Sequence, residues 1–142
     1  MATNPQTLPL AQTLHRRGEW LAAAGAVTLD YAARFLRRKR LTMAGGEGFI
    51  VDLPQTMSLD DGDALELGDG RLVEIHAAPE ALLSVTGPNL TRLAWHIGNR
   101  HTPCQVEADH LLIQADPVIA HMLEHLGAMV TEVTAPFTPE GG

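Results

Sequence analysis

Residues 88–136 read "PNLTRLAWHIGNRHTPCQVEADHLLIQADPVIAHMLEHLGAMVTEVTAP", and two helices can be located in them. In the first half, apolar residues recur at the spacing of one helix face, at Leu90, Leu93, Ala94 and Ile97. In the second half, Asp116 suits the N-cap of a helix, Pro117 its first turn and Gly127 its C-terminal stop. The segment therefore predicts one amphipathic helix before Arg100 and a second one from about residue 116.

Short apolar runs surround these helices at residues 82–85, 104–109, 110–115 and 128–133. Read as strands, they give the order β-α-β-β-α-β, which is that of the ferredoxin-like fold. We therefore expect a C-terminal ferredoxin-like domain over residues 82–142.

The residues before this domain show a different pattern. From Val27 to Ala78, runs of four to seven mostly apolar residues are separated by Gly- and Asp-containing turns, among them "DDGD" at 60–63. Asp69-Gly70 between two such runs is a hairpin signal. We expect a small all-β module over residues 1–78, whose first 24 or so residues form a loosely held terminus. The predicted fold class is thus α+β.

Composition excludes several classes of protein. The chain has 142 residues, 45% of them hydrophobic, which is enough to bury a core. Its formal net charge of −7 argues against nucleic-acid binding. No apolar stretch approaches the roughly 18 residues of a membrane span, and no secretory signal is recognisable. With a single cysteine and hence no internal disulfide, we expect a cytoplasmic protein.

His101 is the first candidate metal ligand. Gly98 or Asn99 is expected to adopt the left-handed conformation that ends the first helix, and Pro103 then prevents its restart. His101 would lie on a constrained, accessible loop, where a neutral imidazole can bind Ni²⁺, Zn²⁺ or Cu²⁺. One histidine makes a poor site, but two copies facing each other across a dimer twofold make a better one. An ordinary surface histidine beside a helix stop is the open alternative.

Two neighbours of His101 are further candidates. His96 precedes it by five residues and could complete a coordination sphere, although a plain position on the helix flank is the favoured interpretation. Cys104 follows by three residues and is either a ligand, half of a Cys–His nucleophilic pair, or a small buried hydrophobe. No nucleophile signature accompanies it.

His121 and His125 stand four residues apart, so they share one face of the second helix. Helical histidines at this spacing can chelate a metal, but no third ligand comes with them, which favours a solvated helix face. His110 lies at a predicted strand turn, and the spacing of the sequence suggests no partner for it.

The stretch "RFLRRKR", residues 34–40, contains five of the ten Lys and Arg residues. It suits a docking strip for an acidic protein surface. It equally suits a solvated edge strand, whose basic side chains discourage pairing with other sheets.

Taken together, the motifs resemble a known family. "WHIGNRHTP" (95–103) and "LLIQADPVIAHMLEHLGAMVTEVTAPFTPEGG" (111–142) are similar to UreE urease accessory proteins, the nickel metallochaperones. "RRKRL" (37–41) and the long run from Leu53 to Val85 are similar to the N-terminal module of the same family.

This resemblance implies a binding protein with no reaction of its own. It implies a homodimer formed through the C-terminal domains, in which His101 of each subunit binds Ni²⁺ at the interface, with Zn²⁺ or Cu²⁺ able to substitute. It also implies transfer of nickel to an accessory GTPase and to the apo-urease complex, with the N-terminal module docking a partner. The auxiliary ligands and the docking residues expected on this basis are His96, His110 and His121, and Arg37, Arg38, Lys39 and Arg40.

Some family features are missing from this sequence. Many members carry a histidine-rich tail, whereas residues 137–142 read "FTPEGG", and some carry histidines where this chain reads "QADP". We therefore expect no high-capacity nickel storage. Two other functions stay open: a metal- or Cys104-dependent hydrolase, and a peptide-binding co-chaperone with incidental metal binding.

Overall fold

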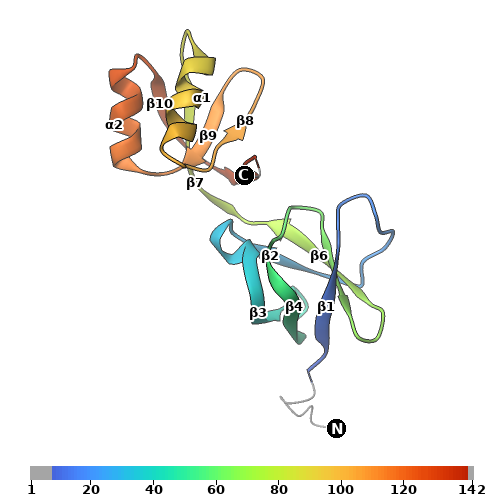
Figure 1. Ribbon diagram of the computed structural model, residues 1–142. Helices are drawn as coiled ribbons and strands as arrows, with labels where there is room; N and C mark the ends of the chain where they lie inside the picture. The colour runs from blue at the N-terminus through green and yellow to red at the C-terminus, as the bar shows by residue number, and fades with distance from the viewer. Residues whose placement is uncertain (1–7, 141–142) are drawn as a thin grey trace. The chain divides into compact units, whose positions relative to one another are not determined.

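The computed structural model describes residues 8–140 and divides the chain into two compact units between Ala77 and Ala78 (Figure 1). Each unit has its own sheet and its own apolar core. None of the helices in the described range is long and apolar enough to cross a membrane.

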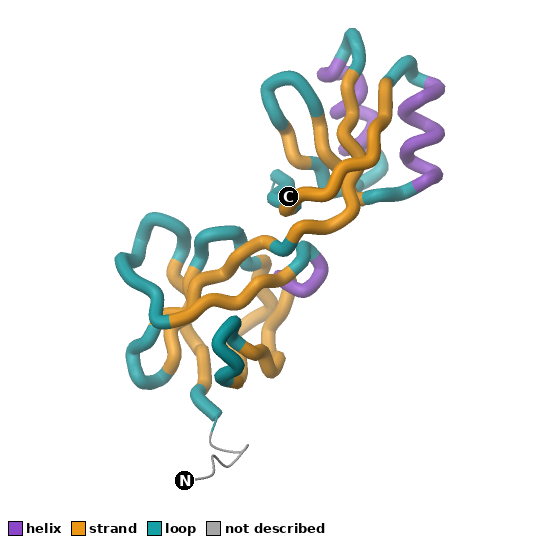
Figure 2. Tube along the Cα trace, turned by 180° about the vertical axis from the view of Figure 1, so that it is seen from behind, coloured by secondary structure: helices purple, strands orange, loops and turns teal. Residues whose placement is uncertain are grey.

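A six-stranded sheet forms the N-terminal unit, in the spatial order β2-β6-β5-β1-β4-β3. Figure 2 shows that this unit consists mainly of strands (orange) and loops (teal). The pairs β1–β4 and β2–β6 are parallel, and the other neighbours are antiparallel. Asp69-Gly70 turns the chain between β5 and β6, with Gly70 at φ 92°, so the predicted hairpin is confirmed. The strands are β1 (Leu10–His15), β2 (Gly25–Leu29), β3 (Phe35–Thr42), β4 (Gly48–Ser58), β5 (Ala64–Leu67) and β6 (Leu72–Ala77).

The expectation of a loosely held N-terminus is wrong for the described residues before 24. Strand β1 lies in the middle of the sheet, parallel to β4 on one side and antiparallel to β5 on the other. Ala11 of this strand is fully buried, while Gln12 and Thr13 are exposed. The strand contributes little apolar surface, so its sequence gives a weak signal even though its backbone pairs on both edges. Residues 1–7 lie outside the described range.

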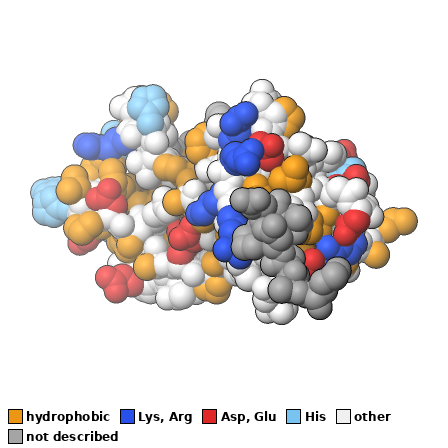
Figure 3. Space-filling view, turned by 90° about the horizontal axis from the view of Figure 1, so that it is seen from below, with side chains coloured by type: hydrophobic (Ala, Val, Ile, Leu, Met, Phe, Trp, Pro, Cys, Tyr) orange, Lys and Arg blue, Asp and Glu red, His pale blue; other side chains and the backbone are white. Residues whose placement is uncertain are grey.

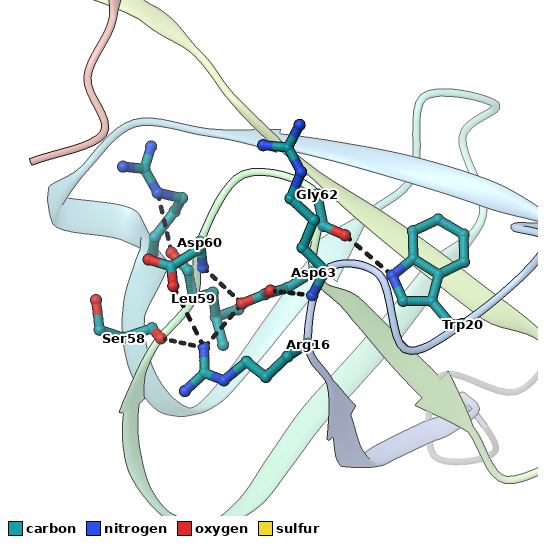
Figure 4. A network of polar contacts seen from close by, with 9 residues as sticks. Arg16, Trp20, Ser58, Leu59, Asp60, Gly62 and Asp63 are labelled. Carbon is teal, nitrogen blue, oxygen red and sulfur yellow. Dashed lines mark hydrogen bonds and ion pairs between the residues drawn. The ribbon is translucent and has the colours of Figure 1, made fainter. Parts of the chain in front are cut away.

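A buried carboxylate ties the segment after β1 to the turn between β4 and β5 (Figure 4). Asp63 is only 1% exposed, and it belongs to the "DDGD" stretch, which forms a turn as predicted. Three donors converge on its two oxygens: Arg16 Nη1 at 2.8 Å, the Arg17 backbone N–H at 2.9 Å and the Asp60 backbone N–H at 2.8 Å. A buried carboxylate is stable only with such partners. The same turn accepts a hydrogen bond from the indole N–H of Trp20 at Gly62 O.

The C-terminal unit has the predicted β-α-β-β-α-β order. Its four strands lie in the order β10-β7-β9-β8, so β9 is inserted between the first strand of the unit and the second. That is the split arrangement of the ferredoxin-like fold. The elements are β7 (Pro79–Thr86), α1 (Leu90–Asn99), β8 (Gln105–Val106), β9 (Leu111–Gln114), α2 (Pro117–His125) and β10 (Met129–Pro136).

Both helices pack on one face of this sheet through a shared core. Apolar side chains of α1 and α2 meet those of β7 and β9 in one cluster, whose fully or nearly fully buried members include Leu93, Ile97, Leu123, Leu83, Val85 and Ile113. Beyond β10, Phe137 is completely buried, and the backbone N–H of Glu140 donates to Cys104 O just before β8. The last described residues are therefore tied to the short edge strand.

Candidate metal-binding site

Helix α1 ends in a Schellman motif that has a histidine at the left-handed position. Gly98 and Asn99 remain in the helix, and His101 has φ 57°, so the expectation that Gly98 or Asn99 adopts the left-handed conformation is wrong. The His101 N–H donates to Gly98 O at 2.9 Å, and the Thr102 N–H donates to Ile97 O at 3.3 Å. These are the two hydrogen bonds that define the motif.

Helix α2 ends in the same way, but with glycine at the equivalent position. Gly127 has φ 89° and donates to Glu124 O, and the Ala128 N–H donates to Leu123 O, each at 3.0 Å. His101 is the one non-glycine residue with positive φ among residues 8–140. For a residue with a Cβ this conformation is unfavourable by about 1–2 kcal/mol. The chain therefore holds a strained histidine where glycine would relieve the strain, and such strain is concentrated at functional sites.

The helix that carries His101 is fixed firmly at its other end. Asn89 caps it by accepting the Arg92 N–H at 3.1 Å, and Leu93 and Ile97 are buried against the sheet. On its outer face, Trp95 is 63% exposed and its ring meets that of half-buried His96 edge-on at 5.0 Å. The imidazole of His101 is exposed, and within residues 8–140 it makes no side-chain hydrogen bond or ion pair. Its ring nitrogens are thus available to an external partner.

Each of the other predicted ligands has a side-chain neighbour of its own within the chain. His110 Nδ1 lies 2.7 Å from Asp109 Oδ1, and this hydrogen bond lowers the pKa of the Asp109 carboxyl. His96 contacts Trp95, and His121 contacts His125. Among the described residues, no group of three His, Cys, Asp or Glu side chains is placed to hold a metal ion.

His121 and His125 form a close pair on the surface of α2. Their Nε2 atoms are 3.2 Å apart, and the ring centroids are 4.6 Å apart with the planes nearly perpendicular. Both side chains are exposed, as the i, i+4 spacing predicts for the polar side of this helix. The contact itself depends on the two rotamers, which the spacing does not specify.

Comparison with known proteins places both units in one family. The family model for the C-terminal domain of UreE urease accessory proteins matches residues 72–142, and that for the N-terminal domain matches residues 6–78. A protein of Ruegeria pomeroyi named urease accessory protein UreE is 59% identical over 135 residues, covering 95% of this chain and 91% of the relative. Its namesake in Cereibacter sphaeroides is 59% identical over 136 residues, covering 95% and 74%.

The chain belongs to the UreE family. A third relative with the same name, from Rhodobacter capsulatus, is 56% identical over 125 residues, covering 88% of this chain and 80% of the relative. UreE proteins are named as accessory proteins, and the chain is an accessory protein rather than an enzyme.

The geometry of Cys104 in this UreE chain agrees with that assignment. The thiol is half-buried and packs against the core beneath the helices. Burial raises the pKa of the Cys104 thiol, and the nearby carboxylate of Glu140 raises it further. A reactive cysteine needs the opposite shift, so these surroundings disfavour a nucleophile. Of the three interpretations of Cys104, the small buried hydrophobe therefore fits best, although the side chain is only partly buried.

Residues 35–40 of the basic stretch of this UreE chain lie on β3, which is an outer strand of the six-stranded sheet, whereas Arg34 ends the preceding 3-10 turn and is buried. The strand's four consecutive basic residues, Arg37, Arg38, Lys39 and Arg40, are all exposed. Arg38 Nη1 lies 3.3 Å from Asp52 Oδ2 on the neighbouring strand. Figure 3 shows Lys and Arg side chains (blue) at several places on the face turned to the viewer, with Asp and Glu side chains (red) among them. An edge strand of this kind suits either interpretation of the stretch, solvation or docking.

Proposed function

We propose that this UreE protein binds Ni²⁺ and delivers it during assembly of the urease active site. Family membership supports the accessory role, since the relatives are named urease accessory proteins. The observation that carries the metal assignment is His101, an exposed imidazole kept in a strained left-handed conformation at the end of α1. A residue held there against its own backbone preference is best explained by what its side chain binds.

The primary site is formed by two copies of the chain. A single His101 supplies one ligand, and an isologous dimer through the C-terminal units would bring the same residue from both subunits to one ion. The exposed ring of Trp95 on the same helix offers apolar surface for such a contact. His96 and His110 are candidate auxiliary ligands of this site, whereas His121, also expected as one, contacts His125 on α2. Zn²⁺ or Cu²⁺ can replace Ni²⁺ because imidazole accepts all three.

This site suits transfer rather than storage. Two imidazoles leave the remaining coordination positions to water, and an accessible site with few protein ligands exchanges its metal more readily than a closed cage of four. The recipients in this proposal are an accessory GTPase and the apo-urease complex, in the cytoplasm.

The basic strand β3 is the proposed docking surface for these partners. Its exposed cations can meet an acidic surface, and a shallow hollow lined by Gln12, Arg37 and Asp52 lies beside it. Reversing charge with Arg37→Glu and Lys39→Glu should weaken capture of the partner complex while leaving Ni²⁺ binding unchanged. Equal capture by the variant would remove the strand from the docking surface.

Calorimetric titration of Ni²⁺ into the full chain tests the metal assignment, with the mass in solution recorded with and without metal. We expect the tightest step to saturate at about one ion per two chains and to vanish in His101→Ala. His76→Ala is the matched control, because His76 is an exposed histidine of the N-terminal unit. If the tightest step survives in His101→Ala, His101 is a helix-end residue only and the proposal fails.

A further inference from the structure

Helix α2 carries a second arrangement of imidazoles that the dimer site does not use. The helix is capped at its start by Asp116, whose carboxylate accepts the N–H groups of Val118 and Ile119. Its buried residues, Ile119 and Leu123, face the sheet. His121 and His125 lie on the outer side, one turn apart and exposed.

The distance between the Nε2 atoms of His121 and His125 is short enough for both to bind the same metal ion. Zinc–imidazole bonds, like those of similar divalent ions, are about 2.0–2.1 Å long, so two nitrogens 3.2 Å apart subtend about 100° at a shared ion. That angle lies between the octahedral and tetrahedral values. The two side chains are therefore already at chelating distance.

The contact between the two rings is a hydrogen bond in one pair of tautomers. When one ring carries its proton on Nε2, that N–H donates to the other Nε2 across the 3.2 Å contact. To bind a metal, the donor ring must move this proton to its own Nδ1, by way of solvent, so that both Nε2 lone pairs become available. Both rings stay neutral in this exchange, and no other side chain within residues 8–140 hydrogen-bonds to either ring.

The position on the helix also favours a cation. His125 is the last residue of α2, where the backbone carbonyl groups give the helix end a partial negative charge. The chain as a whole carries a formal net charge of −7. Neither effect selects one metal, but both make the binding of a divalent cation electrostatically more favourable.

We propose that His121 and His125 form a second metal site, a two-imidazole chelate for a first-row divalent cation such as Ni²⁺, Cu²⁺ or Zn²⁺. This site is complete within one chain, with water in the remaining coordination positions. It is independent of His101 and of dimer formation. Because it has two protein ligands on an open surface and none of the auxiliary histidines proposed for the dimer site, it binds more weakly than the dimer site and exchanges its ion quickly.

The stoichiometry separates the two sites in one titration of the full chain with Ni²⁺. We expect a weaker second step of about one ion per chain, reduced about tenfold or more in affinity by His121→Ala and equally by His125→Ala. The double variant should lose no more than either single variant, since a chelate needs both rings. His101→Ala should abolish the tight step and keep the weak one, and His76→Ala should change neither.

Both positions are exposed on a helix, and alanine is the best helix former, so the variants should keep wild-type circular dichroism. If the double variant binds Ni²⁺ with the wild-type stoichiometry and affinities, the chelate does not exist. If His101→Ala removes both steps, the pair does not act independently. The proposed function fails by a different result, survival of the tight step in His101→Ala, so the two failures are distinguishable.

Discussion

His101→Gly should stabilise the C-terminal unit while removing its proposed primary ligand. The prediction rests on two helix ends with the same hydrogen-bond pattern, one with His101 at φ 57° and the other with Gly127 at φ 89°. At both positions the backbone is left-handed, and only glycine adopts that region without strain.

The expected gain follows from two opposing terms. Removing the Cβ relieves about 1–2 kcal/mol of strain. Glycine in turn increases the entropy of the unfolded chain, which offsets about 0.4–1 kcal/mol of that gain. The net stabilisation is therefore about 0–1.6 kcal/mol. Its central value of about 0.8 kcal/mol corresponds to a rise in Tm of about 3–6 °C for a unit of this size.

The informative comparison is between His101→Gly and His101→Ala, because both lack the ring and differ only in the Cβ. Gly127→Ala is the matched control at the other helix end. A Cβ built on Gly127 meets no atom within 4 Å, so its effect is conformational, and we expect a loss of similar size. Urea unfolding followed by far-ultraviolet circular dichroism suits the measurement, since both α-helices lie in the C-terminal unit.

Equal stability of His101→Gly and His101→Ala, together with a loss of about 1 kcal/mol in Gly127→Ala, would refute the reasoning. His101 would then be under no backbone strain, and its conformation could no longer be used as an argument for function. Both substitutions at position 101 should also lose the tight Ni²⁺ step, whatever their stability.

Three other predictions concern parts of the chain outside the proposed metal sites. Asp63→Ala should lower the free energy of unfolding, measured by urea titration, by about 2–4 kcal/mol, because it leaves Arg16 and two backbone donors without their buried acceptor. Asp60→Ala removes an exposed carboxylate and should lower it by less than about 1 kcal/mol. Hydrogen bonding from Arg71 lowers the pKa of the Glu47 carboxyl below its ordinary value of 4.5 in the folded protein. The ionised carboxylate therefore stabilises the fold above about pH 4.5, and this stabilisation is lost as the pH falls through the lowered pKa. Arg71→Ala should make the fall in Tm on acidification shallower. Cys104, whose thiol pKa is raised by burial, should react with iodoacetamide at pH 7 more slowly than a free cysteine, as followed by mass spectrometry.

Each of these has a contradicting result. Equal losses in Asp63→Ala and Asp60→Ala would mean that the buried network does not hold the turn. Parallel acid-denaturation curves for wild type and Arg71→Ala would show that the Arg71–Glu47 ion pair contributes nothing measurable to stability. Alkylation of Cys104 at the rate of a free thiol would reopen the nucleophile interpretation.

The C-terminal fold could be predicted because its signals are local. The apolar stripe around Leu93 and Ile97, and the Asp116 and Gly127 stops, each depend on residues within one helix. Strand β1 could not be predicted from its sequence, since only Ala11 is buried and the partners of the strand lie 40 to 56 residues further along the chain.

In the candidate site, too, the features that depend on neighbouring residues could be predicted and the others could not. The location of His101 beyond a helix could be predicted from "GNRH", but the left-handed residue was misplaced, because glycine and asparagine are the usual choices and the stop lies two residues later. The helical period places His121 and His125 on one face, yet the 3.2 Å contact requires a choice of rotamers that the sequence does not encode locally. The Asp63 network was missed for a related reason: its donors Arg16 and Arg17 are remote in sequence.

The central position of β1 has a consequence for biosynthesis. This strand leaves the ribosome before the other strands of its sheet, yet it is hydrogen-bonded to β4 and to β5, whose last residue is Leu67. The sheet cannot close until that residue has emerged, and at roughly 5–20 residues per second the delay is on the order of several seconds. During this interval β1, already able to pair with β4, presents an open edge to which other nascent chains can pair. The basic side chains of β3 discourage such pairing only at the opposite edge, which stays an outer edge in the finished sheet.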